Sequence, residues 1–234
     1  MINGEEWCIF HHPEKNPEMK KQFYKMLEED IEHQKIEHPE YIDLSGFHFP
    51  DTITFENDFP KLYLIESCFH GDLIFRKKKS GIIVYLESDF TGMTVKGEAD
   101  FTSVEFKDSL EAFNIKFMKN VCFRNAVFNY VEFSYVTFNG DADFSYTRFK
   151  NGYSEFLFSE FHQNAYFDKS IFEKGGSFWN VWCFEEISFK NAEVKEILYF
   201  NDAWLKKGLI IEKDLKIDER GAKITGRKQV PWDF

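Results

Sequence analysis

Phenylalanine recurs every five or six positions across residues 99–194, ending with Phe178, Phe184 and Phe189. The clearest stretch, residues 121–149, reads VCFRNAVFNYVEFSYVTFNGDADFSYTRF. A small or β-branched residue stands two positions before almost every phenylalanine, as Val131 does before Phe133. Neither the helical period of 3.6 nor the strand period of 2 produces this spacing. A fixed period of self-similar units indicates a stacked repeat.

Each step places a large apolar residue and the small residue before it on one side of an extended segment, with polar residues outward. A chain that turns about 90° after each step returns above its start after four steps, and its amides then pair with the next coil about 4.8 Å away. Groups of four steps span 22 residues from Phe101 to Phe123, then 21 to Phe144, 23 to Phe167 and 22 to Phe189. The sequence therefore predicts an all-β, four-sided solenoid with an interior phenylalanine ladder. The alternation of five- and six-residue steps predicts wider corners or bulges than a strict five-residue repeat.

The core register between Phe106 and Phe117 has two solutions. The core residue is either Ala112, with Leu110 behind it, or Phe113. Even spacing favours Ala112, which leaves Phe113 near the surface.

A helix is predicted ahead of the repeats. Asn16-Pro17-Glu18 combines a capping side chain, proline at the first helical position and an acid at the positive end of the helix dipole. Phe23, Leu27 and Ile31 then lie on one stripe, and Pro39 ends the pattern. A helix with one apolar side in front of a repeat array is expected to cover the apolar cross-section of the first coil.

Three segments follow from these patterns. Residues 1–46 are predicted to be a lead-in with a capping helix, and residues 47–195 the repeat array. Residues 196–234, where the pattern decays, are predicted to be a C-terminal cap without an amphipathic helix.

The repeat units resemble the pentapeptide-repeat family, in a variant rich in phenylalanine. The family unit is a small residue, a polar residue, a central Leu or Phe, and two polar residues; Ala99-Asp100-Phe101 and Ala142-Asp143-Phe144 reproduce its first half. The resemblance covers about residues 47 to 195 and implies a right-handed quadrilateral β-helix. The opening Cys8-Ile9-Phe10-His11 followed by a helix also resembles the lead-in of some phenylalanine-rich members.

Composition and charge narrow the function classes. The chain contains 29 phenylalanines and 5 tryptophans, so one side chain type builds most of the core. With 40 acidic and 29 basic residues, its net charge is −11 at pH 7. This balance argues against direct binding to nucleic acid or an anionic membrane, both of which need basic patches. It is compatible with a basic partner, or with a partner that normally binds nucleic acid.

The cysteines and the apolar runs bear on the compartment. Cys8, Cys68, Cys122 and Cys183 show no paired spacing. No charged-then-apolar leader and no apolar run near 18 residues is present. A reduced, cytoplasmic protein without a membrane segment is expected.

Motifs of catalysis and cofactor binding are missing from the sequence. We find no dinucleotide fingerprint, phosphate-binding loop, nucleophile elbow or zincin helix. A regular β-helix displays its acids on convex faces, where no pocket shifts their pKa values. We therefore expect neither an enzyme nor a bound cofactor.

Two sets of residues have the types that metal sites use. Cys8, His11 or His12, His33 and His38 combine a Cys-x-x-His with a His-x4-His, which zinc accepts. The alternative, which we favour, is that Cys8 packs beside Trp7 and Phe10 while the histidines form a solvated turn and a helix end. Asp141-Ala-Asp143 resembles a cation-binding pair, but Asp143 is also simply the outward residue of its repeat.

One outward column is predicted to be a binding face. Counting sides from Phe101 places glutamates of successive coils on the third side, with large apolar residues just after the core positions there: Glu111, Glu132, Glu155, Tyr135, Leu157, Phe158 and Trp179. Ser177 continues the glutamate column. Glutamates stacked about 5 Å apart repel, and exposed aromatics exceed what solubility favours. We therefore interpret this column as a partner or homodimer surface; the alternative is that outward positions must simply hold something polar.

The function predicted from these observations is a non-catalytic β-helical scaffold for protein–protein interaction. The family resemblance implies an alternative, because some pentapeptide-repeat proteins of similar size and acidity mimic duplex DNA and bind type II topoisomerases such as gyrase. A rod about 20 to 30 Å wide with regularly spaced acids suits a DNA-binding saddle. Two features weaken this alternative: no C-terminal dimerisation helix is evident, and lysines interrupt the acids at Lys116, Lys119, Lys150, Lys169 and Lys190.

Overall fold

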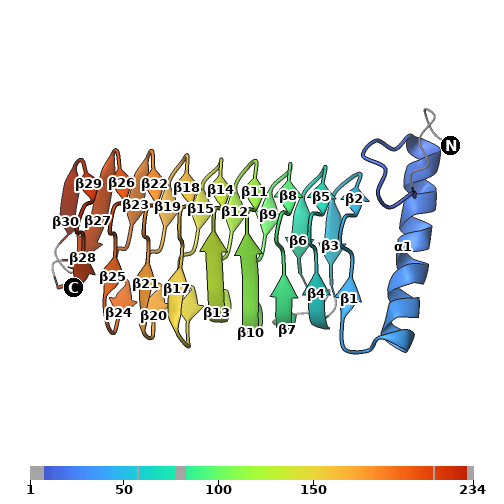
Figure 1. Ribbon diagram of the computed structural model, residues 1–234, viewed down its shortest axis with the longest axis horizontal. Helices are drawn as coiled ribbons and strands as arrows, with labels where there is room; N and C mark the ends of the chain where they lie inside the picture. The colour runs from blue at the N-terminus through green and yellow to red at the C-terminus, as the bar shows by residue number, and fades with distance from the viewer. Residues whose placement is uncertain (1–7, 57, 77–82, 213, 231–234) are drawn as a thin grey trace.

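The chain folds as a β-solenoid of about eight turns preceded by one helix, in a computed structural model that describes residues 8–56, 58–76, 83–212 and 214–230. Figure 1 shows the coils stacked along one axis, with the helix standing across the end of the stack near the N-terminus. The predicted four-sided β-helix with an N-terminal helix is confirmed.

Three parallel sheets run along the solenoid, each built from one strand or two per coil. The first sheet follows the order β1 (Ile42–Asp43), β4 (Phe59–Tyr63), β7 (Ile83–Asp89), β10 (Val104–Phe113), β13 (Val127–Ser134), β17 (Tyr153–Glu155), β21 (Gly175–Ser177), β25 (Leu198–Tyr199) and β28 (Ile217–Asp218), with the additional strands β16 (Arg148–Phe149), β20 (Ile171–Phe172) and β24 (Glu193–Val194).

The other two sheets contain strands of two to five residues. The second sheet consists of β2 (His48–Phe49), β5 (Cys68–Phe69), β8 (Thr94–Val95), β11 (Lys116–Phe117), β14 (Thr137–Phe138), β18 (Glu160–Phe161), β22 (Trp182–Cys183), β26 (Trp204–Leu205) and β29 (Lys223–Ile224). The third sheet consists of β3 (Ile53–Phe55), β6 (Leu73–Phe75), β9 (Ala99–Asp100), β12 (Val121–Cys122), β15 (Ala142–Asp143), β19 (Ala165–Tyr166), β23 (Glu186–Ser188), β27 (Gly208–Glu212) and β30 (Arg227–Val230).

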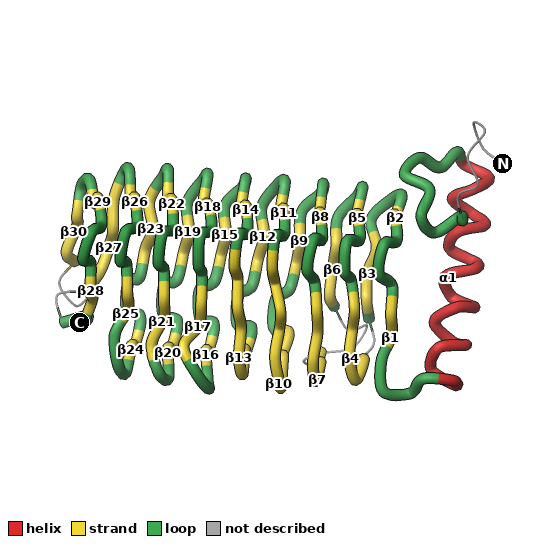
Figure 2. The backbone as a smooth tube through the Cα atoms, in the orientation of Figure 1, coloured by secondary structure: helices red, strands yellow, loops and turns green. Residues whose placement is uncertain are grey.

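Two sides of the solenoid share the first sheet because its middle strands bend around a corner. β10 and β13 each cover both sides, and their pairing shifts register between Phe106 and Ser109. In the next coil, the step from Phe149 to Phe156 is longer and contains Gly152, so the strand divides into β16 and β17. Figure 2 shows this change from long strands to short pairs along the lower edge. The predicted irregularity is therefore concentrated on the side where the step length varies.

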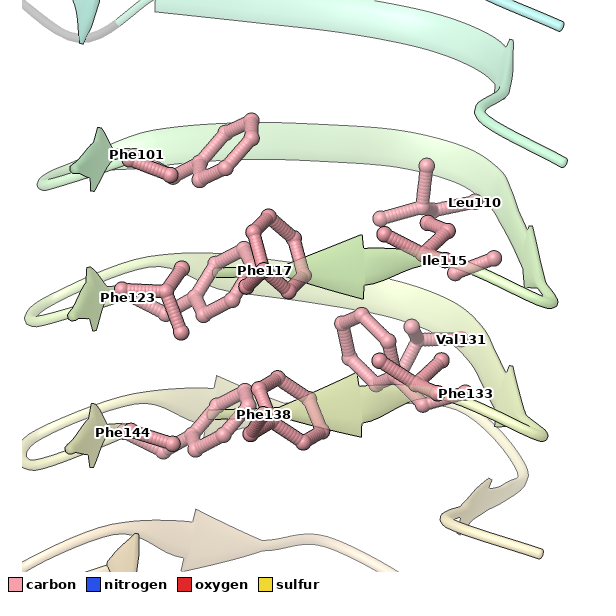
Figure 3. Close-up of a cluster of buried hydrophobic side chains, with 14 of the residues drawn as sticks. Phe101, Leu110, Ile115, Phe117, Phe123, Val131, Phe133, Phe138 and Phe144 are labelled. Atoms are coloured by element: carbon pink, nitrogen blue, oxygen red, sulfur yellow. The ribbon is translucent and has the colours of Figure 1, made fainter. Parts of the chain in front are cut away.

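The interior is a ladder of stacked phenylalanine rings (Figure 3). Phe123 stacks on Phe101 at 4.7 Å between ring centroids and on Phe144 at 4.9 Å, and Phe144 stacks on Phe167 at 4.8 Å. These spacings match the separation of about 4.8 Å between hydrogen-bonded strands. Each buried ring contributes about 2 to 3 kcal/mol before conformational entropy opposes it.

The structure resolves the register between Phe106 and Phe117 as predicted. Leu110 and Ala112 are each 1% exposed, whereas Phe113 is 47% exposed. Ala112 lies opposite Phe133 in the paired strands, which places the small residue beside a large ring.

Phe184 departs from the predicted pattern. Cys183 occupies the core position and is 1% exposed, opposite Phe161 and Leu205 in the ladder. Phe184 lies outside, where its ring stacks on His162 at 4.9 Å. A phenylalanine directly after the core position keeps the periodicity of the sequence while its side chain points away from the interior.

The N-terminal helix α1 (Pro17–Glu37) forms where it was predicted. The Asn16 side chain accepts a hydrogen bond from the Met19 amide at 2.9 Å, which caps the first turn. Phe23 is fully buried, and its ring meets Phe49 of the first coil edge-on at 5.7 Å. The helix therefore covers the apolar end of the phenylalanine ladder.

The solenoid extends beyond the predicted boundaries at both ends. It begins with β1, before residue 47, and β25 to β30 continue the same three sheets after residue 195. The described part of the predicted C-terminal cap therefore consists of additional turns of the same solenoid. The sequence pattern decays there because Leu205 stands in the column of Phe161, while Leu198 and Leu209 stand in columns that hold the small residues Gly176 and Ala165 in earlier coils.

Two further expectations can be compared with the structure. All four cysteines are free thiols. Among the described residues, no helix has the length and apolar character needed to cross a membrane.

Candidate functional site

Four acidic residues stand directly above one another on the first sheet. Backbone pairing places Glu111 of β10 opposite Asp89 of β7 and Glu132 of β13, and places Glu132 opposite Glu155 of β17. Ser177 of β21 continues the column. We call Asp89, Glu111, Glu132 and Glu155 the acidic row. The predicted glutamate column is therefore a structural column, with Asp89 as a further member.

The carboxylates of the acidic row disfavour one another's ionised form. Burial raises the pKa of Glu111, and the neighbouring Asp89 and Glu132 raise it further. Burial likewise raises the pKa of Glu155, with a second contribution from Glu132. The Ser134 hydroxyl donates to Glu132 Oε1 at 2.8 Å. Within the described part of the chain, no basic side chain forms an ion pair with any of the four carboxylates.

Replacing Glu111 and Glu155 together with glutamine should stabilise the fold at pH 7. A carboxyl pKa that is raised in the folded state means that ionisation opposes folding. This penalty is present above the folded pKa and vanishes below the unfolded value of about 4.3. We expect a gain of up to about 1 kcal/mol in the free energy of unfolding at pH 7, which shrinks as the pH falls towards 4. Urea denaturation at both pH values measures the difference.

The exposed glutamate Glu193 on β24 provides the matched control for that experiment. Glu193→Gln should leave the unfolding free energy unchanged at both pH values. A double variant that is less stable than the wild type at pH 7 would show that the two carboxylates make favourable contacts instead.

A strip of aromatic side chains, exposed except for the half-buried Phe158, lies beside the acidic row, at the corner that follows it. Tyr135 and Phe158 stack at 4.9 Å with 6° between their planes. Phe113 meets Tyr135 at 5.2 Å, and Trp179 meets Phe158 at 5.2 Å. Trp179 also donates from Nε1 to Asp202 at 3.2 Å. We call Phe113, Tyr135, Phe158 and Trp179 the aromatic strip.

Tyr135 and Phe158 occupy left-handed backbone conformations, with φ of 58° and 53°. Such a conformation costs a residue with a large side chain about 1 kcal/mol or more. The two residues together therefore cost about 2 kcal/mol or more, and their single ring stack returns only about 0.5 to 1.5 kcal/mol. The equivalent corners of neighbouring coils carry Asn114 and Asn180, with φ of 56° and 54°. Asparagine tolerates this conformation well, so the fold does not require aromatic residues here.

The structure brings all seven predicted face residues to one side of the solenoid. Leu157 is half-buried between the acidic row and the strip, directly after the core residue Phe156. Together, the acidic row, the aromatic strip and Leu157 form what we call the acidic–aromatic face.

Sequence reasoning missed three contributors to this region. Asp89 was missed because the column was counted from Phe101 towards the C-terminus only. Phe113 was placed near the surface but not assigned to the face. Tyr130 lies two residues before Glu132 on the same strand, so strand alternation indicates the same side. Burial, and then Glu155 and Glu132, raise the pKa of Tyr130.

Other sides of the solenoid carry acids and bases in pairs. Arg124 contacts Asp143 at 3.0 Å, and Lys150 contacts Glu105 at 3.0 Å. Further pairs between coils on these sides are Arg76–Asp100, Lys207–Glu185, and Arg148 and Lys195 with Glu173, whereas Lys61–Glu87 lies on the side of the acidic row, two residues before Asp89. These sides therefore have mixed charge, in contrast to the acidic row.

The histidines and cysteine of the predicted zinc set are not brought together. Cys8 and His11 precede the 21-residue helix α1 in a lead-in whose Phe10 contacts Phe23, whereas His33 and His38 lie about 15 and 22 Å farther along the helix axis than Phe23. His33 contacts Glu37 at 3.5 Å, and His38 stacks on Tyr41 at 5.1 Å.

Three other members of the predicted metal sets, His12, Asp141 and Asp143, have protein partners. His12 is buried, and its Nδ1 accepts the Glu14 amide hydrogen at 3.1 Å. Cys8 is exposed, and its predicted neighbour Trp7 lies outside the described residues. Asp143 accepts from Arg124, and Asp141 accepts from the Asn164 amide at 3.0 Å. The carboxylates of Asp141 and Asp143 are thus already hydrogen-bonded to a backbone amide and to an arginine, respectively.

A different cluster of metal-binding residue types lies on the second sheet. One donor atom each of His48, Cys68 and His70 falls within 4.8 Å of the others. Burial lowers the pKa of His48 to about 4, with further lowering by His70 and Lys15, so this imidazole is neutral at pH 7. No spacing motif in the sequence predicts this group, because His48 and Cys68 belong to successive coils.

A groove of about 530 Å³ remains between α1 and the edge of the first coil. Its lining includes Leu27, Ile31, Ile53 and Tyr24. The Tyr24 hydroxyl is buried, and burial raises its pKa to about 12, so it stays protonated at neutral pH. This groove results from a helix that covers the coil with a single stripe of side chains.

Comparison with known proteins identifies the repeat. Residues 123–171, which run from the end of β12 to the start of β20, match the family described as pentapeptide repeats (9 copies). No curated protein and no solved structure matches the chain. The matched segment holds the same small–polar–phenylalanine units that build the coils on either side of it, and the chain is therefore a pentapeptide-repeat protein.

Proposed function

We propose that this chain is a non-catalytic scaffold that binds a protein partner through the acidic–aromatic face. The observation that carries the proposal is the juxtaposition of the acidic row with the aromatic strip on one side of a rigid rod. The row opposes folding, and the strip gives little net stability, so neither feature is explained by the needs of the fold. Both features are useful to a surface that must attract and hold another molecule.

The chemistry of the face indicates what kind of partner it fits. Arginine pairs with carboxylates through a planar fork and also stacks on aromatic rings. The face offers both targets a few ångströms apart, at the strand and at the corner that follows it. Because neighbouring coils fix these side chains, little conformational entropy is lost on binding. We therefore propose a partner whose contact surface combines arginines with apolar side chains.

A homodimer through the same face is less favourable. A two-fold axis presents the same patch on both subunits. Two acidic rows would then approach each other, and like charges facing one another across an interface disfavour association. The face thus fits a different, basic protein better than a second copy of this chain.

DNA mimicry is a second candidate function, favoured by the straightness of the acidic row. One carboxylate per rung of about 4.8 Å compares with one phosphate per about 3.4 Å along a DNA strand. Four rungs extend only about 14 Å, however, which matches about four base steps. The other sides have paired charges, so a DNA-binding enzyme such as a type II topoisomerase would find only a short acidic segment.

A variant that changes the face without changing the fold tests the proposal. Each residue is replaced by one that the same column carries in another coil: Glu132→Ser follows Ser177, and Tyr135→Asn and Phe158→Asn follow Asn114 and Asn180. We expect the melting temperature to fall by no more than about 3 °C relative to the wild type, because the relief of backbone strain at two residues at least offsets the loss of one ring stack. Proteins enriched from a lysate on the immobilised wild type should be lost with the triple variant.

Tyr146→Asn is the matched control. Tyr146 is an exposed aromatic with φ of 60° at a different corner, outside the face. This variant should retain every partner that the wild type retains. A binding profile that is identical for the wild type and the triple variant would refute the role of the face.

A gyrase supercoiling assay with the same proteins separates the two candidate functions. If the wild type inhibits supercoiling and the triple variant does not, the result would favour the proposal that the chain modulates a type II topoisomerase. The scaffold proposal expects no effect on supercoiling at excess protein.

A further inference from the structure

The cluster of His48, Cys68 and His70 lies on the outside of the first two coils, at the solenoid end that α1 covers. His48 of β2 pairs directly with Cys68 of β5, so their side chains stand side by side. His70 follows Cys68 by two residues and therefore points to the same side. His48 Nδ1 lies 3.4 Å from His70 Nε2, and all three donor atoms fall within 4.8 Å of one another.

These separations are close to those that a tetrahedral metal ion imposes. With metal–nitrogen bonds of about 2.0 to 2.1 Å, two imidazole nitrogens lie about 3.3 Å apart. With a metal–sulfur bond of about 2.3 Å, nitrogen and sulfur lie about 3.6 Å apart. The two imidazoles already have the first spacing, and the thiol must move by only about 1 Å to reach the second.

We propose that His48, Cys68 and His70 form a binding site for a zinc-class transition-metal ion with one open coordination position. Two imidazoles and a thiolate select zinc and its neighbours over calcium or magnesium, which prefer oxygen ligands. Three protein ligands leave the fourth position to water or to an external ligand.

The backbone holds all three ligands in place before any metal binds. The Cys68 amide donates to Phe47 O and the His70 amide to Phe49 O, both at 2.9 Å. The His48 amide donates to Phe10 O at 2.7 Å, which ties the first ligand to the lead-in loop. Metal binding therefore needs rearrangement of side chains only.

Lys96 opposes the metal-bound arrangement. Its Nζ lies 3.3 Å from His70 Nδ1, and an ammonium group can only donate. His70 Nδ1 then accepts, and its proton sits on Nε2, the atom that faces His48. A metal ion bound at Nε2 displaces that proton, Nδ1 takes up a proton in its place and turns away from Lys96, and the Cys68 thiol releases its proton to solvent. The site therefore binds more tightly when Lys96 is absent.

Cobalt(II) titration of the chelator-treated full-length chain tests the site directly. We expect visible ligand-field bands together with a thiolate-to-cobalt charge-transfer band, both removed by added zinc. Cys68→Ser should abolish the charge-transfer band and weaken binding by more than about 100-fold. Lys96→Met should strengthen binding by about tenfold, because it removes a nearby positive charge and the competing hydrogen bond.

Cys122→Ser is the control, since Cys122 is also half-buried on an outer side but lies on the third sheet, outside the cluster. It should bind cobalt as the wild type does. Zinc should also raise the melting temperature of the wild type and of Cys122→Ser but not that of Cys68→Ser, which is informative even if one variant is less stable. The absence of a thiolate band in the wild type, or equal bands in Cys68→Ser and the wild type, would overturn the proposal.

Discussion

Replacing Phe144 with alanine is expected to lower the free energy of unfolding by about 4 kcal/mol. Phe144 is fully buried in a central coil and stacks between Phe123 at 4.9 Å and Phe167 at 4.8 Å. Phe133 and Phe156 meet it edge-on at 5.8 and 5.4 Å. Strand pairing holds the coils above and below at a fixed spacing, so the cavity cannot close by collapse. The loss should therefore fall within the range of about 3 to 5 kcal/mol for core phenylalanines rather than below it.

Urea denaturation followed by circular dichroism measures this loss, with two variants for comparison. Phe144→Leu keeps most of the volume and should cost less than about 1.5 kcal/mol. Phe113→Ala removes a phenylalanine that is 47% exposed and should cost less than about 1 kcal/mol. Equal losses for Phe144→Ala and Phe113→Ala would contradict the assignment of the two rings to the core and the surface.

Replacing Phe23 with aspartate is expected to detach α1 from the solenoid and to make the chain self-associate. Phe23 is fully buried, and its ring contacts Phe10, Tyr24 and Phe49 edge-on. A carboxylate at this position loses that packing and is desolvated, and Lys15, whose Nζ lies 4.8 Å from the Phe23 ring centroid, offsets only part of that cost. The apolar end of the ladder and the edges of the first strands then become exposed, which favours pairing with another chain.

Light scattering after size-exclusion chromatography, over a range of concentrations, detects this association. The coils away from α1 contact only their neighbours, so the β-sheet signal in circular dichroism should remain. Ile36→Asp on the same helix is the control, because Ile36 is 80% exposed. If Phe23→Asp has the same mass and stability as the wild type, α1 does not protect the end of the solenoid.

Most of the fold was predictable because the core is periodic. A repeated spacing between phenylalanines specifies which residues stack, and it correctly selected Ala112 over Phe113 for the interior. Helix α1 was predictable from local capping chemistry at Asn16 and Pro17. Phe184 shows the limit of this reasoning, because a one-residue difference in register moves a side chain from the inside to the outside. Only the pairing of Cys183 with Phe161 and Leu205 identifies the core residue there.

The candidate site was predictable to the same extent and for the same reason. Glu111, Glu132 and Glu155 fall in regular coils, so counting steps placed them in one column. Asp89 precedes the regular array, where step lengths vary, and its place in the row follows only from its pairing with Glu111.

The spacing of residues along the chain is enough to predict the solenoid, its inward and outward positions and the order of its regular columns, because each of these repeats at a nearly constant interval. The tertiary structure alone decided how the irregular first coils lie against each other and against the lead-in loop. That arrangement brings His48, Cys68 and His70 together. His48 and Cys68 are 20 residues apart along the chain but adjacent in neighbouring coils. Contacts between successive coils depend on the length and bulges of every intervening corner, and no local pattern of residue types records those lengths.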